Sequence, residues 1–227
     1  MTDFFRFPHT PHLAWLGAGT PRDDKVLAPT EARALLAGEV TVEEKLDGAN
    51  LGVSVDRAGT LLLQNRGQFL SPPFGGQFSR AAAWLARHEH ELAPALGDTL
   101  ILFGEWCAAR HSVFYDYLPD WFVAFDIYDR AAQKFWTTTR RDSWAAALDL
   151  AVVPLLARRR MTLAEVKALV MAGTSRFGRM PLEGLIIRRE GAAFLEQRAK
   201  LVRPDFTQAM GGHWRSRRIE WNALAHA

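Results

Sequence analysis

Cysteine is almost absent from this chain of 227 residues, which contains only Cys107. A single thiol excludes an internal disulfide framework and a zinc site built from several cysteines. Seven histidines are present, but no pair of them has the spacing of metal ligands. We therefore expect the histidines to lie at the surface and to hold no metal.

Long apolar runs are also lacking. The most apolar internal run, 145–157, is interrupted by Asp149 and Pro154. The first eight residues contain Asp3 and Arg6 where a signal peptide has its apolar core. We therefore expect a cytoplasmic protein that spans no membrane. Repeats, low-complexity tracts and linkers are missing as well, which favours one compact domain.

The composition is that of a globular protein, with 48% hydrophobic and 23% charged residues and a net charge of only +3. The basic residues are nevertheless grouped. The groups are Arg140-Arg141, Arg158-Arg159-Arg160 and Arg215, Arg217 and Arg218. Such groups suit a phosphate backbone, but solvated helix ends would give the same pattern. Charge alone leaves nucleic-acid binding open.

Alternating and β-branched segments predict a fold dominated by strands. The predicted strands are 40–45, 51–56, 60–65, 99–107, 121–128, 134–137, 183–189 and 194–202. The predicted helices are 30–37, capped by Thr30, then 78–92, 139–150 and 162–172, the last opened by a Thr162–Glu165 capping box. Strands in blocks, without regular βαβ alternation, indicate an α+β fold with antiparallel sheets flanked by helices. Residues 1–38 form a turn-rich lead-in and residues 204–227 a short basic tail.

One segment, 43–50, has the residue types that covalent phosphoryl chemistry needs. A predicted strand ends at Lys45 and runs into Asp47-Gly48, a turn that frees the lysine side chain from the sheet. A lysine attacks phosphorus only when neutral, and at its ordinary pKa of about 10.4 only on the order of one in a thousand is neutral near physiological pH. Nearby cations or a metal, with partial burial, would lower this pKa. An ordinary β-turn with a solvated lysine would show the same residues.

Five further polar segments follow in a fixed order along the predicted strands. They are Asn65-Arg66-Gly67, Gly104-Glu105, Phe125-Asp126, Glu183-Gly184 and Arg198-Ala199-Lys200. An arginine can fork onto phosphate oxygens, a carboxylate can bridge ribose hydroxyls, and an aromatic ring can lie on a purine. Each segment taken alone also has a structural explanation, such as Phe125 in the core or Arg66 as surface charge. The order of the segments is what favours a nucleotide site.

In this order the segments resemble the collinear motifs of the covalent nucleotidyltransferases, which include ATP-dependent RNA and DNA ligases and mRNA capping enzymes. They are most similar to the RNA-ligase family, the branch of phage RNA ligase 2 and the RNA-editing ligases. The similarity spans residues 44–200, and Asn50 falls where this branch has an asparagine near the reactive phosphates. The resemblance implies a single nucleotidyltransferase domain over residues 1–227. It also implies no C-terminal OB-fold, because only 27 residues follow Lys200.

The resemblance further implies a role for each matched residue. Lys45 would carry AMP covalently, and Glu183 would hold Mg²⁺ or Mn²⁺ through its water shell. ATP would be bound by Glu44, Lys45, Asn50, Arg66, Glu105, Phe125, Arg188, Arg198 and Lys200, with Glu44 and Phe125 on adenine, Glu105 on the ribose, and Arg198 and Lys200 on the α-phosphate. RNA would contact Arg66, Arg203, Arg215, Arg217 and Arg218. Catalysis would depend on Lys45, Glu183, Arg198 and Lys200.

Two positions depart from the pattern of phage RNA ligase 2. Arg188 and Arg198 stand where that ligase has lysines. Arginine keeps the charge but presents a planar fork instead of a compact ammonium. Phosphate geometry at these two positions is therefore in question.

The function that these residues imply is ATP-dependent sealing of RNA ends that carry a 5′-phosphate and a 3′-hydroxyl, in RNA repair. An end-healing kinase-phosphatase is an expected partner. Two alternatives stay open at this stage: a DNA ligase that relies on a separate partner to clamp DNA, and a non-catalytic module of the same fold that holds nucleotide or RNA. Retention of Lys45, Glu105, Glu183 and Lys200 together favours an enzyme.

Overall fold

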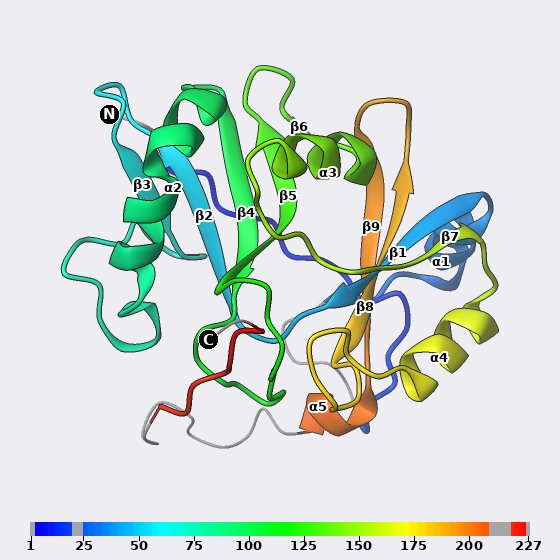
Figure 1. Cartoon of the computed structure of the whole chain (residues 1–227). Helices are drawn as coiled ribbons and strands as arrows, with labels where there is room; N and C mark the ends of the chain where they lie inside the picture. The colour runs from blue at the N-terminus through cyan, green and yellow to red at the C-terminus, as the bar shows by residue number, and fades with distance from the viewer. Residues whose placement is uncertain (1–2, 20–24, 209–218, 226–227) are drawn as a thin grey trace.

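Two antiparallel sheets lie side by side in the computed structural model, which describes residues 3–19, 25–208 and 219–225 (Figure 1). The strands are β1 Glu39–Lys45, β2 Ala49–Val55, β3 Leu61–Gln64, β4 Leu100–Trp106, β5 Phe122–Asp129, β6 Lys134–Phe135, β7 Leu155–Arg160, β8 Gly184–Glu190 and β9 Leu195–Val202. The helices are α1 Pro29–Leu36, α2 Ala81–Leu96, α3 Thr138–Ala146, α4 Leu163–Ala172 and α5 Pro204–Gln208, with one 3₁₀ turn, Gly76–Phe78. This arrangement confirms the predicted α+β class.

The chain passes from one sheet to the other directly after Lys45. One sheet has the order β7-β1-β8-β9 and the other β3-β2-β4-β5-β6, with every neighbouring pair antiparallel. β1 belongs to the first sheet and β2 to the second, so residues 46–48 form the crossing between them. The predicted lysine turn therefore lies where the two sheets meet.

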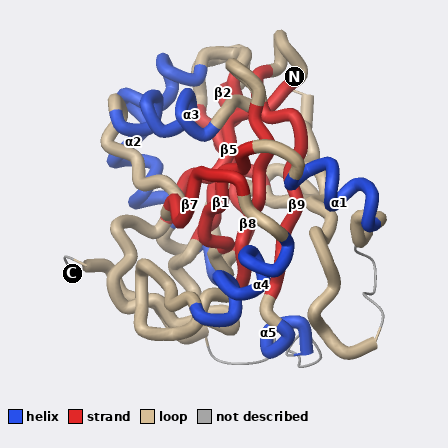
Figure 2. The backbone as a smooth tube through the Cα atoms, turned by 90° about the vertical axis from the view of Figure 1, so that its right-hand side faces the viewer, coloured by secondary structure: helices blue, strands red, loops and turns tan. Residues whose placement is uncertain are grey.

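Each sheet has helices on one face, which buries its apolar residues. Trp84 and Leu92 of α2 pack on the five-stranded sheet in a cluster with Leu51. Leu35 of α1 and Val166 of α4 pack on the four-stranded sheet. Figure 2 views the molecule from the side of this four-stranded sheet and shows α4 over the lower ends of its strands and α1 beside them. The helices thus cover one face of each sheet, and the opposite side holds both an apolar cluster around Phe103 and buried charged side chains such as Glu43 and Asp126.

Two local signals in the sequence are confirmed. Residues 56–60 form the tight turn between β2 and β3, in which Gly59 has φ +83°. Thr162 accepts a hydrogen bond from the Glu165 amide, and the Glu165 carboxylate accepts one from the Thr162 amide. Both features depend only on residues within four positions of each other, which is why the sequence predicts them.

Three expectations were wrong. Residues 155–160 were not predicted as a strand, yet they form edge strand β7, so Arg158–Arg160 are exposed on a sheet edge rather than at a helix end. The first helix is not capped by Thr30. It begins at Pro29, whose fixed φ suits the first helical position, and Glu31 accepts a hydrogen bond from the Ala28 amide.

The third wrong expectation concerns the histidines. His12 is only 3% exposed, because the N-terminal segment lies along β9. The amide of Lys200 donates to the Pro11 carbonyl, and the amide of Leu13 donates to the Lys200 carbonyl.

Among the described helices, none combines the length and the apolar composition needed to cross a bilayer.

Candidate functional site

Lys45 lies at the end of β1 and is paired with Glu183. Its Nζ donates to both carboxylate oxygens, at 2.8 and 2.6 Å. The pairing follows from the sheet, since Lys45 is opposite Gly184 on β8 and Glu183 is the residue before that strand. Burial works against the charged amine, but the carboxylates of Glu183, Glu105 and Asp47 outweigh it and raise the pKa of Lys45. In the free protein the lysine is therefore an ammonium ion, whereas the sequence suggested a lowered pKa.

The turn that follows Lys45 is held by the loop between β4 and β5. The Asp47 carboxylate accepts hydrogen bonds from the amides of Ser112 (2.6 Å) and Val113 (3.0 Å), and the Asp47 amide donates to the Tyr115 hydroxyl (2.7 Å). Gly48 approaches the next strand so closely that a Cβ there would lie 2.5 Å from the Trp106 carbonyl oxygen. The Asp-Gly pair is thus required for this turn to fit between the sheets.

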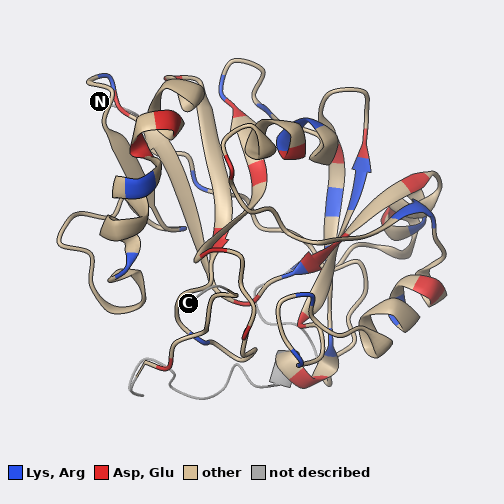
Figure 3. Ribbon diagram, viewed as in Figure 1, with Lys and Arg blue, Asp and Glu red and all other residues tan. Residues whose placement is uncertain are grey.

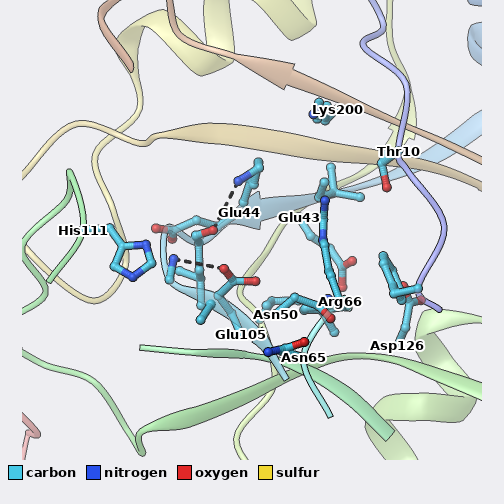
Figure 4. Close-up of a pocket in the computed structure, with 18 of the residues that line it drawn as sticks. Thr10, Glu43, Glu44, Asn50, Asn65, Arg66, Glu105, His111, Asp126 and Lys200 are labelled. Carbon is cyan, nitrogen blue, oxygen red and sulfur yellow. Dashed lines mark hydrogen bonds between the residues drawn. The ribbon is translucent and has the colours of Figure 1, made fainter. Parts of the chain in front are cut away.

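Glu105 and Asn50 are opposite each other on β4 and β2. Glu105 accepts a hydrogen bond from the Gly48 amide at 3.0 Å. Burial raises the pKa of Glu105 to about 7, with Lys45 opposing and Asp47 adding to the shift. Asn50 Oδ1 is buried and has no hydrogen-bond partner among the described residues. Both groups line the cavity beside Lys45 (Figure 4) and are suited to accept hydrogen bonds from a bound molecule.

We predict a pH-dependent difference in stability between the wild-type protein and Glu105→Gln. Because the pKa of Glu105 is raised in the folded state, its stabilising contribution is present below the unfolded value of about 4.5 and is lost as the pH rises through about 7. Glutamine mimics the protonated acid at every pH. Wild type should therefore lose on the order of 2 kcal/mol relative to Glu105→Gln between pH 5 and pH 8. Urea unfolding at both pH values measures this, and an unchanged difference would contradict the raised pKa.

Phe125 lines the same cavity from β5, where the strand contains a bulge. Phe103 is opposite Asp126 and Gly104 is opposite Ala124, so Phe125 is the extra residue without a partner in the ladder. Bulges re-aim side chains next to functional sites. The Phe125 carbonyl accepts hydrogen bonds from Arg141 (2.6 Å) and Arg188 (2.9 Å) instead.

Arg188 and Arg141 belong to a buried network of charges between the sheets. Glu43 accepts from Arg141 and from Arg188, each at 2.6 Å, and all three side chains are at most 2% exposed. Asp126 pairs with Arg188 at 2.7 Å and also with Arg198. In Figure 3, drawn in the view of Figure 1, acidic and basic positions occur on the strands of both sheets and on α3. Each of the three nitrogens of the Arg188 guanidinium thus donates to one acceptor, Glu43, Asp126 or the Phe125 carbonyl.

Arg198 lines the cavity from β9. Its guanidinium carbon lies 4.4 Å from the ring centroids of both Phe7 and Phe135, two rings that contact each other edge to face at 5.5 Å. Burial lowers the pKa of Arg198 to about 10, and Asp126 works in the opposite direction. Arginine in place of lysine therefore serves the ion-pair network as well as the cavity.

Of the other predicted residues, some line the cavity and others do not. Arg66 and Lys200 line the cavity, from the segment after β3 and from β9. The carboxylate of Glu44 accepts from the Ser175 hydroxyl (2.5 Å) and the Arg176 amide (2.9 Å), on the loop after α4. Arg203 donates to the Met171 carbonyl and pairs with Asp205. Arg215, Arg217 and Arg218 lie outside the described residues.

Several cavity residues were missed by the sequence analysis. Glu43 and Lys45 share a face of β1, and this two-residue spacing was the available signal. His111 also lines the cavity, contrary to the expectation of surface histidines, and it contacts Gln77 at 2.8 Å. Burial lowers the pKa of His111, so the ring is neutral near pH 7. No local pattern marks His111, because it reaches the site through the loop after β4.

Most of these groups line one cavity of about 530 Å³, large enough for a nucleotide. Glu183 and Arg203 are not among its lining residues, and Glu183 adjoins the cavity through its contact with Lys45. The polar lining residues of the cavity are Thr10, Glu43, Glu44, Lys45, Asn50, Asn65, Arg66, Gln77, Glu105, His111, Asp126, Arg188, Arg198 and Lys200. In the described part of the chain, no group of three or more His, Cys, Asp or Glu side chains could hold a metal ion. A metal in this cavity would therefore need ligands from a bound molecule or from water in addition to the protein.

Comparison with known proteins places this chain in one family. The sequence matches the family model described as RNA ligase over residues 38–202, which is more than half of the chain. The protein therefore belongs to the RNA ligase family. No curated protein matches the sequence.

Solved structures of RNA ligases have the same fold. A Naegleria gruberi RNA ligase with pyrophosphate is 19% identical, with a TM-score of 0.63 over 91% of this chain and 64% of that one. A variant of the Naegleria ligase with ATP and Mn is 18% identical, with a TM-score of 0.63 over 88% and 63%. An archaeal ATP-dependent RNA ligase is 20% identical, with a TM-score of 0.58 over 88% and 49%. This chain thus spans about half to two thirds of the length of these relatives.

Proposed function

We propose that the protein is an ATP-dependent RNA ligase that joins 5′-phosphate and 3′-hydroxyl ends through a covalent lysyl-AMP. The observation that carries the proposal is the position of Lys45 in the wall of a nucleotide-sized cavity that Glu105, Phe125 and Lys200 also line. Membership of the RNA ligase family supports it, as do the relatives solved with ATP and Mn or with pyrophosphate.

In the first step Lys45 Nζ attacks the α-phosphorus of ATP, and pyrophosphate leaves. The amine must first lose its proton, because in the free protein the surrounding carboxylates raise the pKa of Lys45 and favour the ammonium form. Glu183 is the group that accepts this amine's hydrogen bonds, and burial raises the pKa of Glu183 to about 7 although Lys45 opposes the shift. A carboxylate with that pKa, directly on the amine, is placed to receive the proton.

A divalent cation fits this end of the cavity. Two buried carboxylates with raised pKa values, Glu105 and Glu183, lie near a single ammonium, so the site is short of positive charge when both are ionised. Glu183 and the phosphates of ATP would hold Mg²⁺ or Mn²⁺. When bound, the ion would offset the charge that develops on the phosphoryl oxygens. Lys200 and Arg66 line the cavity and would act on the same charge.

The rest of the nucleotide would occupy the wall formed by β2, β4 and β5. Phe125 offers its ring to adenine, and Glu105 offers its carboxylate to the ribose hydroxyls. Asn50 has a buried oxygen without a partner among the described residues, which a bound group would satisfy. Arg188 would support the site through the Phe125 carbonyl, because each of its guanidinium nitrogens already donates to a protein acceptor.

In the later steps AMP passes to a 5′-phosphate, and a 3′-hydroxyl displaces AMP to seal the strand. Arg66 is exposed at the cavity and would contact the phosphate strand, together with Arg203 and the arginines at 215, 217 and 218. We infer a role in RNA repair in the cytoplasm, alongside a kinase-phosphatase that prepares the ends.

The sugar at the 3′-hydroxyl end provides the test that separates RNA from DNA sealing. The 2′-hydroxyl is the feature that distinguishes ribose beside the reacting phosphate. We expect efficient sealing when the last one or two sugars on the 3′-hydroxyl side are ribose, whichever sugar carries the 5′-phosphate. Matched nicked duplexes that differ only in these sugars, sealed in single turnover, measure it. Equal rates for ribose and deoxyribose ends would favour a DNA ligase, and no sealing with any end would contradict ligase activity.

A further inference from the structure

The described C-terminal residues return to the loop that holds the Lys45 turn. We call residues 107–118 the site loop and residues 220–225 the C-terminal clasp. Trp221 bridges to Ala109, and Leu224 bridges to Leu118. In Figure 1 the red C-terminal segment lies beside the green loop that follows β4. The clasp lies beyond residues 38–202, which match the family model, so the family pattern assigns it no role.

Asn222 is the centre of the contact between the clasp and the site loop. Its side chain is 4% exposed. The Nδ2 group donates to the carbonyls of Cys107 (2.8 Å) and Ala109 (3.4 Å), and Oδ1 accepts from the Tyr115 amide at 3.0 Å. The backbone amide of Asn222 also donates to the Ala108 carbonyl at 3.0 Å. The buried side chain of Asn222 thus bonds both the start of the site loop, at Cys107 and Ala109, and its later part, at Tyr115.

The opposite side of the site loop holds the turn after Lys45. The Tyr115 hydroxyl accepts from the Asp47 amide, and the Asp47 carboxylate accepts from the amides of Ser112 and Val113. Tyr115 therefore takes part in both contacts, with its amide on Asn222 and its hydroxyl on Asp47. A further contact ties the clasp to the start of α2, since the guanidinium of Arg80 lies 4.6 Å from the ring of Trp221 and 4.5 Å from that of Trp121.

We propose that Asn222 is a positioning residue for the transfer of AMP to Lys45 and acts through the site loop. This inference rests on the proposed function. An amine that attacks phosphorus must be held close to its target and in line with the leaving group, and a displacement of about 1 Å can cost on the order of a hundredfold in rate. Asn222 of the clasp holds the site loop, and the site loop holds Asp47 through its hydrogen bonds. Asp47 lies in the turn that directly follows Lys45, so these contacts position the lysine.

The test compares Asn222→Ala, Tyr115→Phe and the double variant in the full chain. At saturating ATP, the single-turnover rate constant for lysyl-AMP formation, per active site titrated by AMP incorporation, should fall tenfold or more in each single variant. The KM for ATP should change less than threefold, because Phe125 and Glu105 bind the nucleotide from other strands. The double variant should be no slower than the slower single variant, since both changes break one linkage.

Hydrogen exchange provides a second measurement that needs no activity. In Asn222→Ala, the amides of Ser112, Val113 and Asp47 should exchange faster, while β8 and β9 keep wild-type protection. Glu220→Ala is the control, because it removes only the exposed ion pair with Arg110 and should leave both measurements unchanged.

Two results would overturn the inference. The first is an Asn222→Ala protein with a lower melting temperature but a rate constant per active site within twofold of wild type. The second is unchanged exchange at Asp47, Ser112 and Val113. A wild-type protein that forms no lysyl-AMP would count against the proposed function instead, and the exchange experiment would still decide whether Asn222 holds the Lys45 turn.

Discussion

Replacement of Lys45 by alanine should abolish covalent labelling of the protein with AMP. Wild-type protein mixed with ATP and Mg²⁺ or Mn²⁺ should gain the mass of one AMP, and peptide mapping should place it on Lys45. The reason is chemical: Lys45 Nζ is the nitrogen at the crossing of the two sheets, in contact with Glu183 and beside Glu105. Alanine supplies no nucleophile, so the expected loss is complete within detection. Intact-mass spectrometry measures it.

Lys25→Ala is the matched control for this experiment. Lys25 also pairs with a glutamate, Glu31 at 3.2 Å, but its side chain is 67% exposed. An exposed pair of this kind contributes little to stability, and Lys25 is not among the residues that line the cavity at Lys45. Labelling of Lys25→Ala should equal that of wild type. An AMP adduct on another residue would overturn the assignment of Lys45, and no adduct in wild type under any metal would contradict the proposed enzyme.

Replacement of Glu43 by glutamine should destabilise the protein strongly. Glu43 is 1% exposed and is the shared partner of Arg141 and Arg188, whose side chains are each 2% exposed. Burial alone would raise the pKa of Glu43, but the two guanidinium groups outweigh it and lower the pKa. Loss of this charge removes the carboxylate that Arg141 and Arg188 share and leaves Asp142 and Asp126 as their remaining partners. Breaking a buried ion pair costs about 3–5 kcal/mol. For a chain of this size the melting temperature should fall by roughly 10 °C.

Glu196→Gln provides the comparison, because it breaks an arginine–glutamate pair of similar length at the surface. Glu196 pairs with Arg189 at 3.1 Å, and its side chain is 52% exposed. Such a pair is worth about 0–1 kcal/mol, so the melting temperature should change by no more than roughly 4 °C. Thermal unfolding by circular dichroism measures both variants. Equal shifts for Glu43→Gln and Glu196→Gln would contradict the view that the buried network holds the two sheets together.

The network also explains why two arginines stand where phage RNA ligase 2 has lysines. An ammonium is a point donor, whereas a guanidinium can bridge several acceptors in one plane. Arg188 bonds Glu43, Asp126 and the Phe125 carbonyl at once. The substitution keeps a positive charge in the site and adds a fixed connection between β1, β5 and β8. The sequence showed the substitution, but it gave no indication of these partners.

What the sequence determined by itself is local in character. The alternation of apolar residues predicted the strands that carry Lys45, Glu105, Phe125 and Lys200, and the strand that begins directly after Glu183. The Asp56–Thr60 turn and the Thr162–Glu165 capping box followed from residues within four positions of one another. The order of the segments was enough to indicate the RNA ligase family, which the match over residues 38–202 confirms. These inferences succeed because each depends only on residues that are close in the sequence, or on the order of the segments along the chain.

The tertiary structure alone decided which charges meet and which are buried. Glu43 and Arg141 are 98 positions apart, and Asn222 reaches Cys107 across 115. Strand β7 was missed because a run of arginines lacks a strand's apolar pattern, and its pairing with β1 supplies the hydrogen bonds that the pattern could not indicate. The raised pKa of Lys45 likewise depends on three carboxylates that converge only when the sheets meet. Pairings of this kind depend on topology and register, which are properties of the whole fold and are not encoded in any short stretch of sequence.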